Sequence, residues 1–366
     1  MTLRRTLALA FSAALAASTA TAADLSDSLK KGTPDLKSAG PLAFGPDGIL
    51  FVGDTQGAAV FAIDTGDKSG PQEKPAVKLE NVASKVAAKL GTDPQKLLIT
   101  DMAVNPASGK VYLAVSRGKG PDATPVILRV GSEGVLEEVS LENVKFAKAE
   151  VPNAPAPGAV VRGTSPRAES ITDLAFVDGR LFLAGLSNEE FSSRLISIPF
   201  PFAGPADAAA IEIYHGAHGR FETKSPVRTF VAYQINKEPF LLAAYTCTPL
   251  VKVPVADLKP GAHVKGTTIA ELGNRNRPLD MVAYHKDGKD FLLLANSSRG
   301  VMKIPTENAG GAAGITSPVQ GTKGLAYETI ASLKGVTELD QLDGKHAVVL
   351  VRDDAGTLNL ETVDLP

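Results

Sequence analysis

A pair of histidines is the first candidate for chemistry in this chain. His215 and His218 form an H-x-x-H pair with glycines beside them. A loop of that spacing can bring two imidazoles to one transition metal, and Glu222 or a nearby aspartate could complete the site. Alternatively, both histidines are solvated, or one of them only binds a backbone carbonyl.

Cys247 is the only cysteine, and it follows Tyr245 and Thr246 directly. Its thiolate could be a metal ligand, or a nucleophile activated by His218. The alternative is an inert, buried thiol. The chain has no G-x-S-x-G elbow, Walker loop, C-x-x-C-H haem site or H-E-x-x-H, which removes several common enzyme classes.

Carboxylates at equivalent positions of a repeat form a second group of candidates. They are Asp101, Asp173, Asp280 and Glu338. Carboxylates around one channel could bind a hard cation such as Ca²⁺. Alternatively, they fix turns and accept hydrogen bonds from the neighbouring repeat. The residues alone leave both interpretations open.

Polar residues near the end of the second strand of each repeat differ from one copy to the next. The predicted ligand-binding set is Arg117, Asn188, Tyr245, Asn296, Arg299 and Arg352. If these positions had a purely structural role, the six repeats would carry similar residues there. Because the residues differ, we expect them to line an asymmetric polar pocket. Its arginines would suit an anionic group.

These candidates belong to a unit that recurs six times. Each copy holds an apolar triplet, a tight turn, an apolar strand, a polar loop and a second apolar strand. The copies start at Pro41, Asp101, Asp173, Thr229, Asp280 and Glu338. A further β-like run follows the first five, at residues 76–82, 135–141, 210–216, 267–273 and 325–331. Each unit is therefore a four-stranded antiparallel meander, and the sequence predicts an all-β, six-bladed β-propeller.

Closure of the ring needs a strand from outside the sixth unit, which ends after three strands at Pro366. Residues 23–40 are the expected source, and their pairing would protect the edges of the first and last blades. Seven blades remain an alternative, as does a β-sandwich or a pair of smaller β domains.

Loop lengths indicate which face of the propeller carries function. The turns between the first and second strands are minimal, whereas several connections between units are long. Residues 83–90 should form a short helix ended by Gly91, residues 143–170 are a Pro- and Ala-rich connection, and the next connection carries the histidines. Binding residues favour variable loops on a rigid scaffold, so we expect the site on this loop-rich face.

The N-terminus predicts export. Residues 1–22 contain Arg4 and Arg5, a short apolar run and a terminal Ala-Thr-Ala, which is the pattern of a cleaved signal peptide. The expected organisation is a signal peptide at 1–22, a closing segment at 23–40 and one propeller domain at 41–366. The mature chain would be periplasmic or secreted, without stable membrane insertion. Without Arg4 and Arg5 it keeps 36 of the 38 basic side chains against 40 acidic ones, which is no footprint for nucleic acid.

The hairpins LAFGPDGILFVGD and DMAVNPASGKVYLAVSRG resemble those of NHL and gluconolactonase-type six-bladed propellers. The resemblance implies either a ligand- or protein-binding propeller or a calcium-dependent lactonase or hydrolase. In the hydrolytic branch a divalent cation lies at the channel mouth. Here Asp101, Asp173, Asp280 and Glu338, with Asn188 or Asn296, would hold it.

The leading hypothesis is an exported propeller that binds a small molecule, a metal ion or a periplasmic protein through its loop-rich face. The alternative is a metal-dependent hydrolase or lactonase with its site at the channel mouth, where a divalent cation, calcium or a transition metal, would activate water. Electron transfer is disfavoured because the chain lacks a haem motif and tryptophan.

Overall fold

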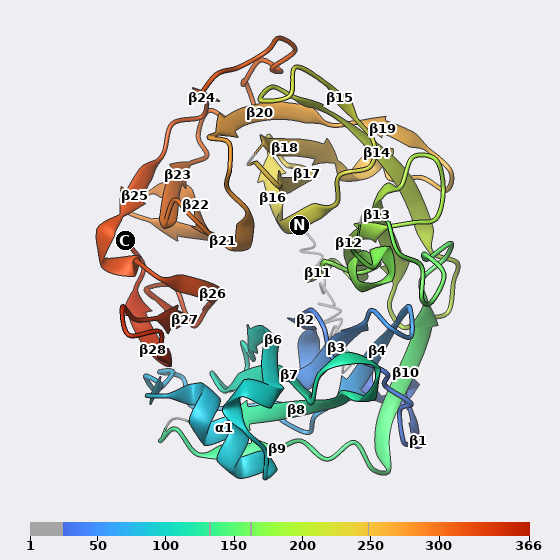
Figure 1. The fold of residues 1–366 in the computed structure, drawn as a ribbon, viewed down its shortest axis with the longest axis vertical. Coiled ribbons are helices and arrows are strands. Elements are labelled where there is room, and N and C mark those ends of the chain that lie inside the picture. Colours follow the sequence, from blue (N-terminus) through green and yellow to red (C-terminus); the bar gives the residue numbers. More distant parts are fainter. Residues whose placement is uncertain (1–24, 132, 162, 248) are drawn as a thin grey trace, which may run out of the picture.

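Six small antiparallel sheets form a ring around a central channel (Figure 1). The computed structural model describes residues 25–366, apart from residues 132, 162 and 248. The six-bladed β-propeller predicted from the repeat is confirmed, and each predicted unit supplies the three inner strands of one blade. We number the blades by the order of these units. The signal peptide predicted at residues 1–22 lies outside the described residues.

The strands of blades 1 to 3 are given from the channel outwards. Blade 1 contains β2 (Leu42–Phe44), β3 (Ile49–Asp54), β4 (Ala59–Asp64), β10 (Val144–Glu150) and β1 (Lys30–Gly32). Blade 2 contains β6 (Leu97–Val104), β7 (Val111–Arg117), β8 (Thr124–Val130) and β9 (Leu136–Glu138). Blade 3 contains β11 (Asp173–Val177), β12 (Arg180–Leu186), β13 (Ser193–Pro199), β14 (Asp207–His215) and β15 (Arg220–Glu222), and β19 (His263–Lys265) pairs in parallel with β14.

Blades 4 to 6 follow the same plan. Blade 4 contains β16 (Val227–Ile235), β17 (Glu238–Tyr245), β18 (Pro249–Pro254), β20 (Thr267–Leu272) and β24 (Thr322–Gly324). Blade 5 contains β21 (Pro278–Lys286), β22 (Lys289–Asn296), β23 (Val301–Pro305) and β25 (Glu328–Ile330). Blade 6 contains β26 (Val336–Gln341), β27 (His346–Arg352), β28 (Leu358–Asp364) and β5 (Lys78–Leu79).

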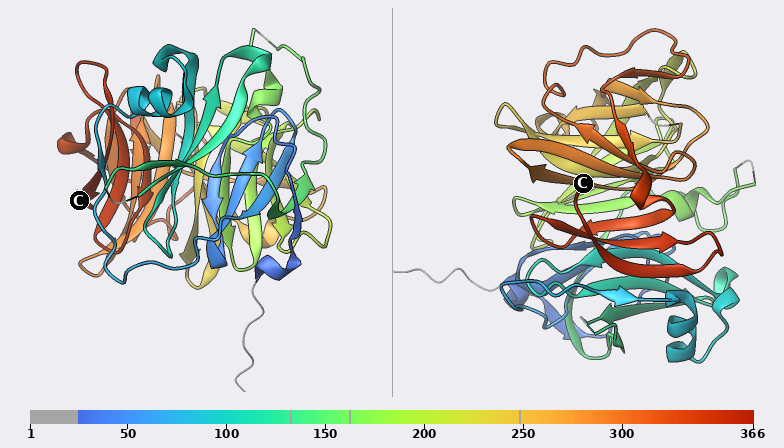
Figure 2. Two further views of the ribbon diagram at one scale, coloured as in Figure 1. Left: turned by 90° about the horizontal axis from the view of Figure 1, so that it is seen from below. Right: turned by 90° about the vertical axis from the view of Figure 1, so that its left-hand side faces the viewer.

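Helices are short and lie in the connections. The α-helix α1 (Val82–Leu90) forms where residues 83–90 were predicted to be helical, and Gly91 ends it with φ 62°. We call the face that carries α1 the upper face; Figure 2 shows the ring from the side with α1 at that face. The 3₁₀ turns are Leu25–Ser28, Pro46–Gly48, Pro94–Lys96, Gly120–Asp122, Pro166–Glu169, Val255–Asp257 and Ala331–Leu333.

Burial between blades explains why the middle strands are almost continuously apolar. All six residues of β3 are buried, because neighbouring blades cover both faces of the sheet. Ile49 and Phe51 pack towards blade 3, whereas Leu50 and Val52 pack towards blade 2, as the alternation of a β-strand requires. Six apolar clusters therefore fill the six boundaries between blades.

These clusters show that the order of the blades around the ring differs from their order in the chain. Blade 1 packs against blades 2 and 3, and blade 2 packs against blade 6. The inner strands touch in the order β2, β6, β26, β21, β16 and β11 before returning to β2. Blade 2 and strand β5 are thus inserted between the third and fourth strands of blade 1.

This insertion overturns three expectations. Residues 76–82 do not complete blade 1, because their strand β5 pairs with β28 of blade 6, with Leu79 opposite Leu360. The fourth strand of blade 1 is instead β10, which lies in the stretch 143–170 that was expected to be a connection. The segment predicted to close blade 6, residues 23–40, does not do so in its described part, residues 25–40, since β1 pairs with β10 at the outer edge of blade 1. Of the other four predicted outer runs, three contain β9, β20 and β25, and the run at 210–216 overlaps most of β14.

The carboxylate of Asp54 holds the segment that precedes β2 on blade 1. It is buried at the end of β3 and accepts hydrogen bonds from the backbone N–H groups of Lys37 and Ser38, at 2.8 and 2.9 Å. Gly40 N–H also donates to the carbonyl of Gly53. This segment is therefore fixed on blade 1, which does not adjoin blade 6. The strand that closes the ring is β5, which follows blade 1's third strand in the chain.

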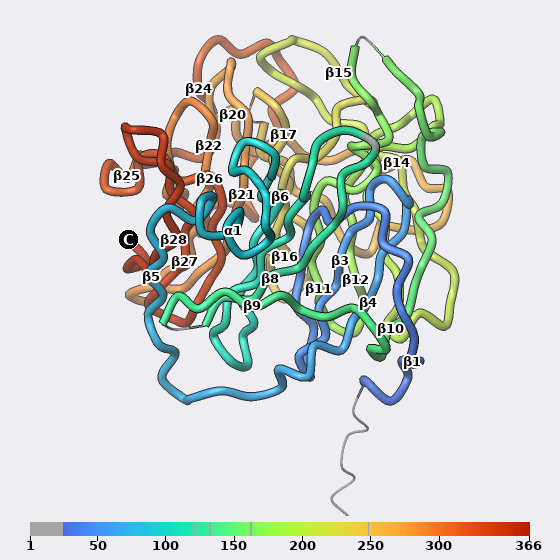
Figure 3. Tube along the Cα trace, turned by 60° about the horizontal axis from the view of Figure 1, so that its bottom comes forward, coloured from blue at the N-terminus to red at the C-terminus, as the bar shows by residue number. Residues whose placement is uncertain are grey.

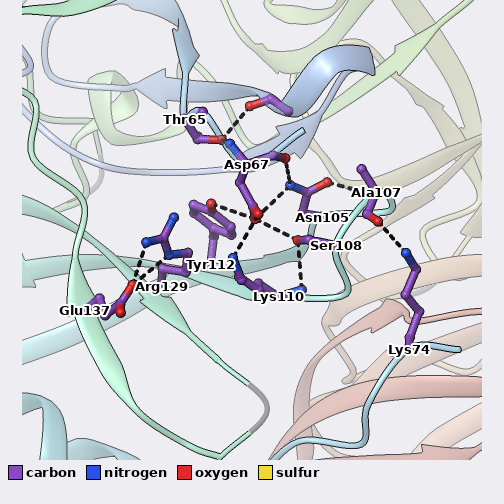
Figure 4. Close-up of polar contacts among 12 residues, drawn as sticks. Thr65, Asp67, Lys74, Asn105, Ala107, Ser108, Lys110, Tyr112, Arg129 and Glu137 are labelled. Carbon is purple, nitrogen blue, oxygen red and sulfur yellow. Dashed lines mark hydrogen bonds and ion pairs between the residues drawn. The ribbon is translucent and has the colours of Figure 1, made fainter. Parts of the chain in front are cut away.

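The segment that makes this crossing is residues 65–77, called the strap here. Figure 3 shows it in light blue, running from β4 past blade 2 to β5. Its main anchor is Asp67, whose carboxylate accepts hydrogen bonds from Asn105 Nδ2 (3.0 Å), Ser108 Oγ (2.7 Å), Lys110 Nζ (3.0 Å) and Tyr112 OH (3.1 Å) (Figure 4). All four donors belong to blade 2, so one buried carboxylate ties the strap to the blade that it spans.

Candidate metal centre

Two loops from neighbouring blades meet at the upper face. The first is the turn between β14 and β15 of blade 3 (Figure 1). His215 ends β14, and its carbonyl accepts hydrogen bonds from the N–H groups of His218 (3.1 Å) and Gly219 (2.8 Å). Gly219 has φ 65°, a conformation that glycine adopts without strain. The H-x-x-H pair is therefore folded into a tight β-turn and not a flexible loop.

The second loop joins β17 to β18 in blade 4 and carries Cys247. The N–H of Cys247 donates to the carbonyl of Asn276 at 2.7 Å, and the φ of Cys247, 65°, lies in the left-handed region. Tyr245, two residues earlier, is fully buried in the cluster between blades 3 and 4. The backbone thus fixes the partly exposed thiol at the boundary with blade 3.

The structure brings His215, His218 and Cys247 together. One donor atom from each residue lies within 4.8 Å of the others. Among the described residues, this is the one group of three or more His, Cys, Asp and Glu side chains close enough to share an ion. Bonds of about 2.0–2.3 Å to one metal would place such donors up to about 4 Å apart, so small changes of side-chain torsion complete the geometry.

Glu222 orients both imidazoles. Its Oε2 lies 2.9 Å from His215 Nδ1, and its Oε1 lies 2.7 Å from His218 Nδ1. Burial alone would raise the pKa of Glu222, but hydrogen bonds from His215, His218 and Ser225 hold that pKa well below its usual range. The ionised carboxylate accepts from both Nδ1–H groups, which leaves the Nε2 lone pairs for a metal. This carboxylate–histidine pairing is typical of metal sites.

Unpartnered polar atoms are a further property of this region. His215 is 2% exposed, and its Nε2 is buried without a hydrogen-bond partner. The other such side-chain atoms among the described residues are Ser193 Oγ, Arg194 Nε, Tyr245 OH and Glu271 Oε2. All five residues lie at ends of strands in blades 3 and 4. Since buried polar groups normally have partners, the unpartnered Nε2 of His215 is an atom that a bound ligand would satisfy.

Glu271 supports the turn from below. Its Oε1 accepts the N–H of Gly216, and burial raises its pKa. A Cβ at Gly216 would meet Glu271 at 2.9 Å and Val319 at 3.0 Å, so glycine permits this close packing. Sequence analysis missed Glu271; its signal was a lone charge within the apolar strand β20.

The donor set suits a particular class of ions. Imidazole nitrogen and thiolate sulfur favour zinc, copper and related transition metals, whereas calcium requires oxygen ligands. Three protein donors also leave one tetrahedral position for water or another molecule. The buried, unpartnered Nε2 of His215 is consistent with a ligand position. The residues present therefore fit a transition metal.

The carboxylates of the inner strands line one small cavity in the upper channel. Asp101, Asp173, Asp280 and Glu338 surround about 160 Å³ of space. The aspartates also cross blade boundaries. Asp173 Oδ2 accepts from the N–H of Phe230, and Asp280 Oδ2 from that of Leu339, both at 2.7 Å.

The same bridging recurs at two further boundaries. Asp101 accepts from Leu42 N–H, and Asp340, which sequence analysis did not select, accepts from Val104 N–H at 2.7 Å. These bonds match the structural interpretation of the repeated acids. The shared calcium ion stays a prediction.

These carboxylates give a testable pH dependence. Burial raises the pKa of Asp173 from 3.8 to about 7, and the charge of Asp340 adds to the effect. The folded state thus holds this proton to higher pH than the unfolded state. Its contribution to stability is complete below pH 3.8 and is lost as pH rises through about 7.

The variant Asp173→Asn cannot lose that contribution by titration. We therefore expect the difference in unfolding free energy between the native chain and Asp173→Asn to decline as pH rises across this window. Urea denaturation at a series of pH values measures it, with Asp178→Asn, at an exposed turn, as the control. A difference that stays constant with pH would contradict the argument.

The six residues predicted to bind a ligand do not gather in this way. They lie at the upper ends of five blades: Arg117, Asn188, Tyr245, Asn296, Arg299 and Arg352. Tyr245 and Asn296 are buried, and Asn296 accepts a hydrogen bond from Asn276 at 2.8 Å. Arg299 and Arg352 donate to the carbonyls of Asn274 and Gly356. Their common role in an asymmetric pocket stays a prediction.

Comparisons with known proteins add little beyond fold. No protein-family model and no curated protein matches the chain. A solved Thermus thermophilus protein, provisionally named an oxidoreductase (glucose dehydrogenase), is 14% identical with a TM-score of 0.35, over 92% of this chain and 99% of that one. A bifunctional GH43-CE protein of Bacteroides eggerthii is 14% identical with a TM-score of 0.36, over 74% of this chain and 33% of that one.

The extracellular region of plexin A4 is 7% identical with a TM-score of 0.39, over 92% of this chain and 40% of that one. Similarities this low carry no argument about activity. The resemblance to NHL and gluconolactonase-type propellers also stays a prediction beyond the fold itself. Among the described residues, none of the helices has the length and apolarity that crossing a membrane requires.

Proposed function

We propose that this chain is an exported metal-binding protein that holds one transition-metal ion at His215, His218 and Cys247. The observation that carries the proposal is the convergence of these three donors within 4.8 Å. They come from two blades and lie up to 32 positions apart in the sequence, beside the carboxylate that orients both imidazoles. Chance clustering of two histidines would not require a single carboxylate, that of Glu222, to be only 10% exposed and shared between them.

Export is part of the proposal and is supported by the signal-peptide pattern of residues 1–22. An exported chain with a single cysteine cannot form an internal disulfide. Its thiol is therefore available as a thiolate ligand, provided that metal protects it from oxidation.

Elemental analysis tests this function. The full chain is produced with its own leader, recovered from the exported fraction without chelators, and measured for metal per chain. We expect close to one equivalent of zinc or copper in the native chain and almost none after Cys247→Ser together with His218→Ala. The matched control, His285→Ala, alters an exposed histidine of blade 5 that contacts Asp290 on the same blade, away from the proposed site. Equal metal content in all three proteins, or none in the native chain, would refute the proposal.

Glu222→Gln provides a milder test of the same site. Glutamine keeps one acceptor oxygen but presents an NH₂ group to the second imidazole, which disturbs its orientation. Loss of such a partner lowers metal affinity by about 10- to 100-fold. Competition with a chromophoric chelator measures the change, with Glu212→Gln, on the outer part of β14, as the control. An unchanged affinity would show that Glu222 does not orient the ligands.

A hydrolytic role is the second candidate. It is favoured by the free coordination position, where a metal-bound water could attack an ester or lactone. Zinc-loaded protein should then hydrolyse a panel of lactones and aryl esters at a rate that falls with Cys247→Ser. If the loaded protein has no activity above free zinc, binding without hydrolysis is the better description.

A further inference from the structure

We infer that the metal at this centre is copper and that the centre transfers single electrons. The inference rests on the proposed metal site and goes further by naming the metal and its chemistry. Two imidazoles and one thiolate form a His₂Cys set, which is the ligand set of mononuclear copper centres that carry electrons. Both Cu(I) and Cu(II) accept these donors. A His₂Cys copper centre requires neither a haem motif nor tryptophan, so their absence from the chain does not bear on this set.

Fixed ligand positions are the first structural support. Each imidazole is held at Nδ1 by Glu222, and Glu222 is itself held by Ser225 Oγ at 2.8 Å. The two rings lie 3.9 Å apart between centroids. Because this framework does not depend on the charge of the ion, the ligands can keep their places when copper gains or loses an electron. Preorganisation of this kind reduces the structural change that accompanies transfer.

The loop that carries the thiol is fixed as well. Cys247 N–H is bonded to the carbonyl of Asn276, and the adjacent Thr246 Oγ1 accepts from Arg228 Nε at 3.0 Å. Arg228 is in turn paired with Glu169 at 2.7 Å. These contacts tie the cysteine loop to blades 3 and 5. The sulfur therefore belongs to a rigid framework.

Access differs between the two histidines. The side chain of His215 is 2% exposed, whereas that of His218 is 44% exposed at the upper face. Val319 packs on Gly216, and Pro318 packs on Gly219, so one loop covers the other side of the turn. An electron carrier can thus approach the outer edge of His218, while His215 stays covered and Cys247 is only partly exposed. One imidazole would serve as the route for the electron.

The electron-transfer step is simple to balance. Cu(II) would accept one electron and become Cu(I). The carrier that donates this electron would be oxidised by one electron. The bonds to sulfur and to both Nε2 atoms are kept, and no proton moves. The reverse step returns the electron to a second carrier. Hexacyanoferrate(II) and hexacyanoferrate(III) can replace these carriers in the laboratory.

The test uses the mature chain loaded with one equivalent of Cu(II) without oxygen. We expect an intense visible band from charge transfer between the thiolate and Cu(II), together with the electron paramagnetic resonance signal of one copper. One equivalent of hexacyanoferrate(II) should remove both, and hexacyanoferrate(III) should restore them over repeated cycles. Cys247→Ser should abolish the intense band, whereas His285→Ala should keep it. Circular dichroism verifies that each variant is folded.

Three other outcomes would overturn the inference, and they are distinguishable. If the chain binds one equivalent of zinc, but two Cu(II) ions oxidise the Cys247 thiolates of two chains to a disulfide-linked dimer and become two Cu(I), the metal-binding function stands and the electron-transfer inference fails. If neither zinc nor copper binds to the folded chain, the proposed function fails too. A Cu(II) signal that persists unchanged in Cys247→Ser would also contradict the inference, because the copper would then lie elsewhere.

Discussion

Replacing His215 by alanine is expected to lower the affinity of the chain for its transition metal by about 100-fold or more. Loss of an orienting partner already costs about 10- to 100-fold, and removal of a ligand itself should cost at least the upper part of that range. The remaining pair would hold the ion through an exposed imidazole and a partly exposed thiol. Isothermal titration with zinc under nitrogen, competed by a chelator, measures the loss.

The control for this variant must separate binding from folding. His215 is buried, so alanine also removes packing beneath the turn. His215→Gln retains volume and one hydrogen-bonding group towards Glu222 without an equivalent Nε2 donor. We expect His215→Gln to keep the native unfolding temperature more closely than His215→Ala while losing metal affinity to a similar extent. Native affinity in a folded His215→Gln chain would contradict the assignment of this ligand.

Replacing Asp67 by alanine is expected to lower the stability of the folded chain more than any other single substitution in the strap. Four donors of blade 2 converge on its carboxylate, and the side chain is 2% exposed. Burial alone would raise the pKa of Asp67, but hydrogen bonds from Ser108 and Lys110 lower it, so the group is a carboxylate in the folded chain. Breaking such a buried network costs about 3 kcal/mol.

The loss of stability in Asp67→Ala should be greatest where β5 pairs with β28 and closes the ring. Without its anchor, the strap no longer fixes the approach to β5, which is then held on blade 6 by its two paired residues and by the hydrogen bonds between Val77 and Thr362. We expect thermal unfolding to shift down by roughly 5 °C or more, and hydrogen exchange to accelerate in β5 and the adjacent β28. Glu73→Ala, an exposed acid on the same strap, should change stability by less than about 0.5 kcal/mol. Equal effects of the two substitutions would show that the network does not secure closure.

The repeated sequence pattern made the three inner strands of each blade predictable. The order of segments along the chain could not show that the outer strands β5 and β10 belong to blades 6 and 1. The pattern of an apolar strand after a tight turn is strong in segments such as ILFVGD and FLLLAN, which are buried on both faces. By contrast, β5 has two paired residues, and nothing in Lys78–Leu79 specifies which blade it joins. Its place depends on Asp67 and on the length of the strap, both of which act over long range.

Strand β10 was predictable in part. Val144, Phe146, Ala147 and Ala149 alternate with lysines and Glu150 in much of VKFAKAE, a pattern close to that of a half-buried strand. The surrounding Pro- and Ala-rich sequence obscured it. Pairing of this strand with β4 across an inserted blade is a tertiary property, and periodicity alone cannot supply the partner.

The candidate centre shows the same division. His215, His218, Glu222 and Cys247 were each selected for their chemistry, and the loop-rich face was predicted to carry them. Their meeting depends on packing between blades 3 and 4, because Cys247 follows the hairpin by more than 20 residues. The dual contact of Glu222 could not be read from spacing, since it requires the turn to fold both imidazoles onto one carboxylate.

X-ray absorption at the metal edge tests the central claim most directly. The protein is loaded with one equivalent of zinc, the loading confirmed by elemental analysis, and the nearest-neighbour shell is determined. The proposed ligands predict one sulfur at about 2.3 Å and two imidazole nitrogens at about 2.0–2.1 Å, with a light atom permitted in the fourth position. The sulfur should disappear in Cys247→Ser. A shell of oxygen and nitrogen alone in the native chain would contradict the account.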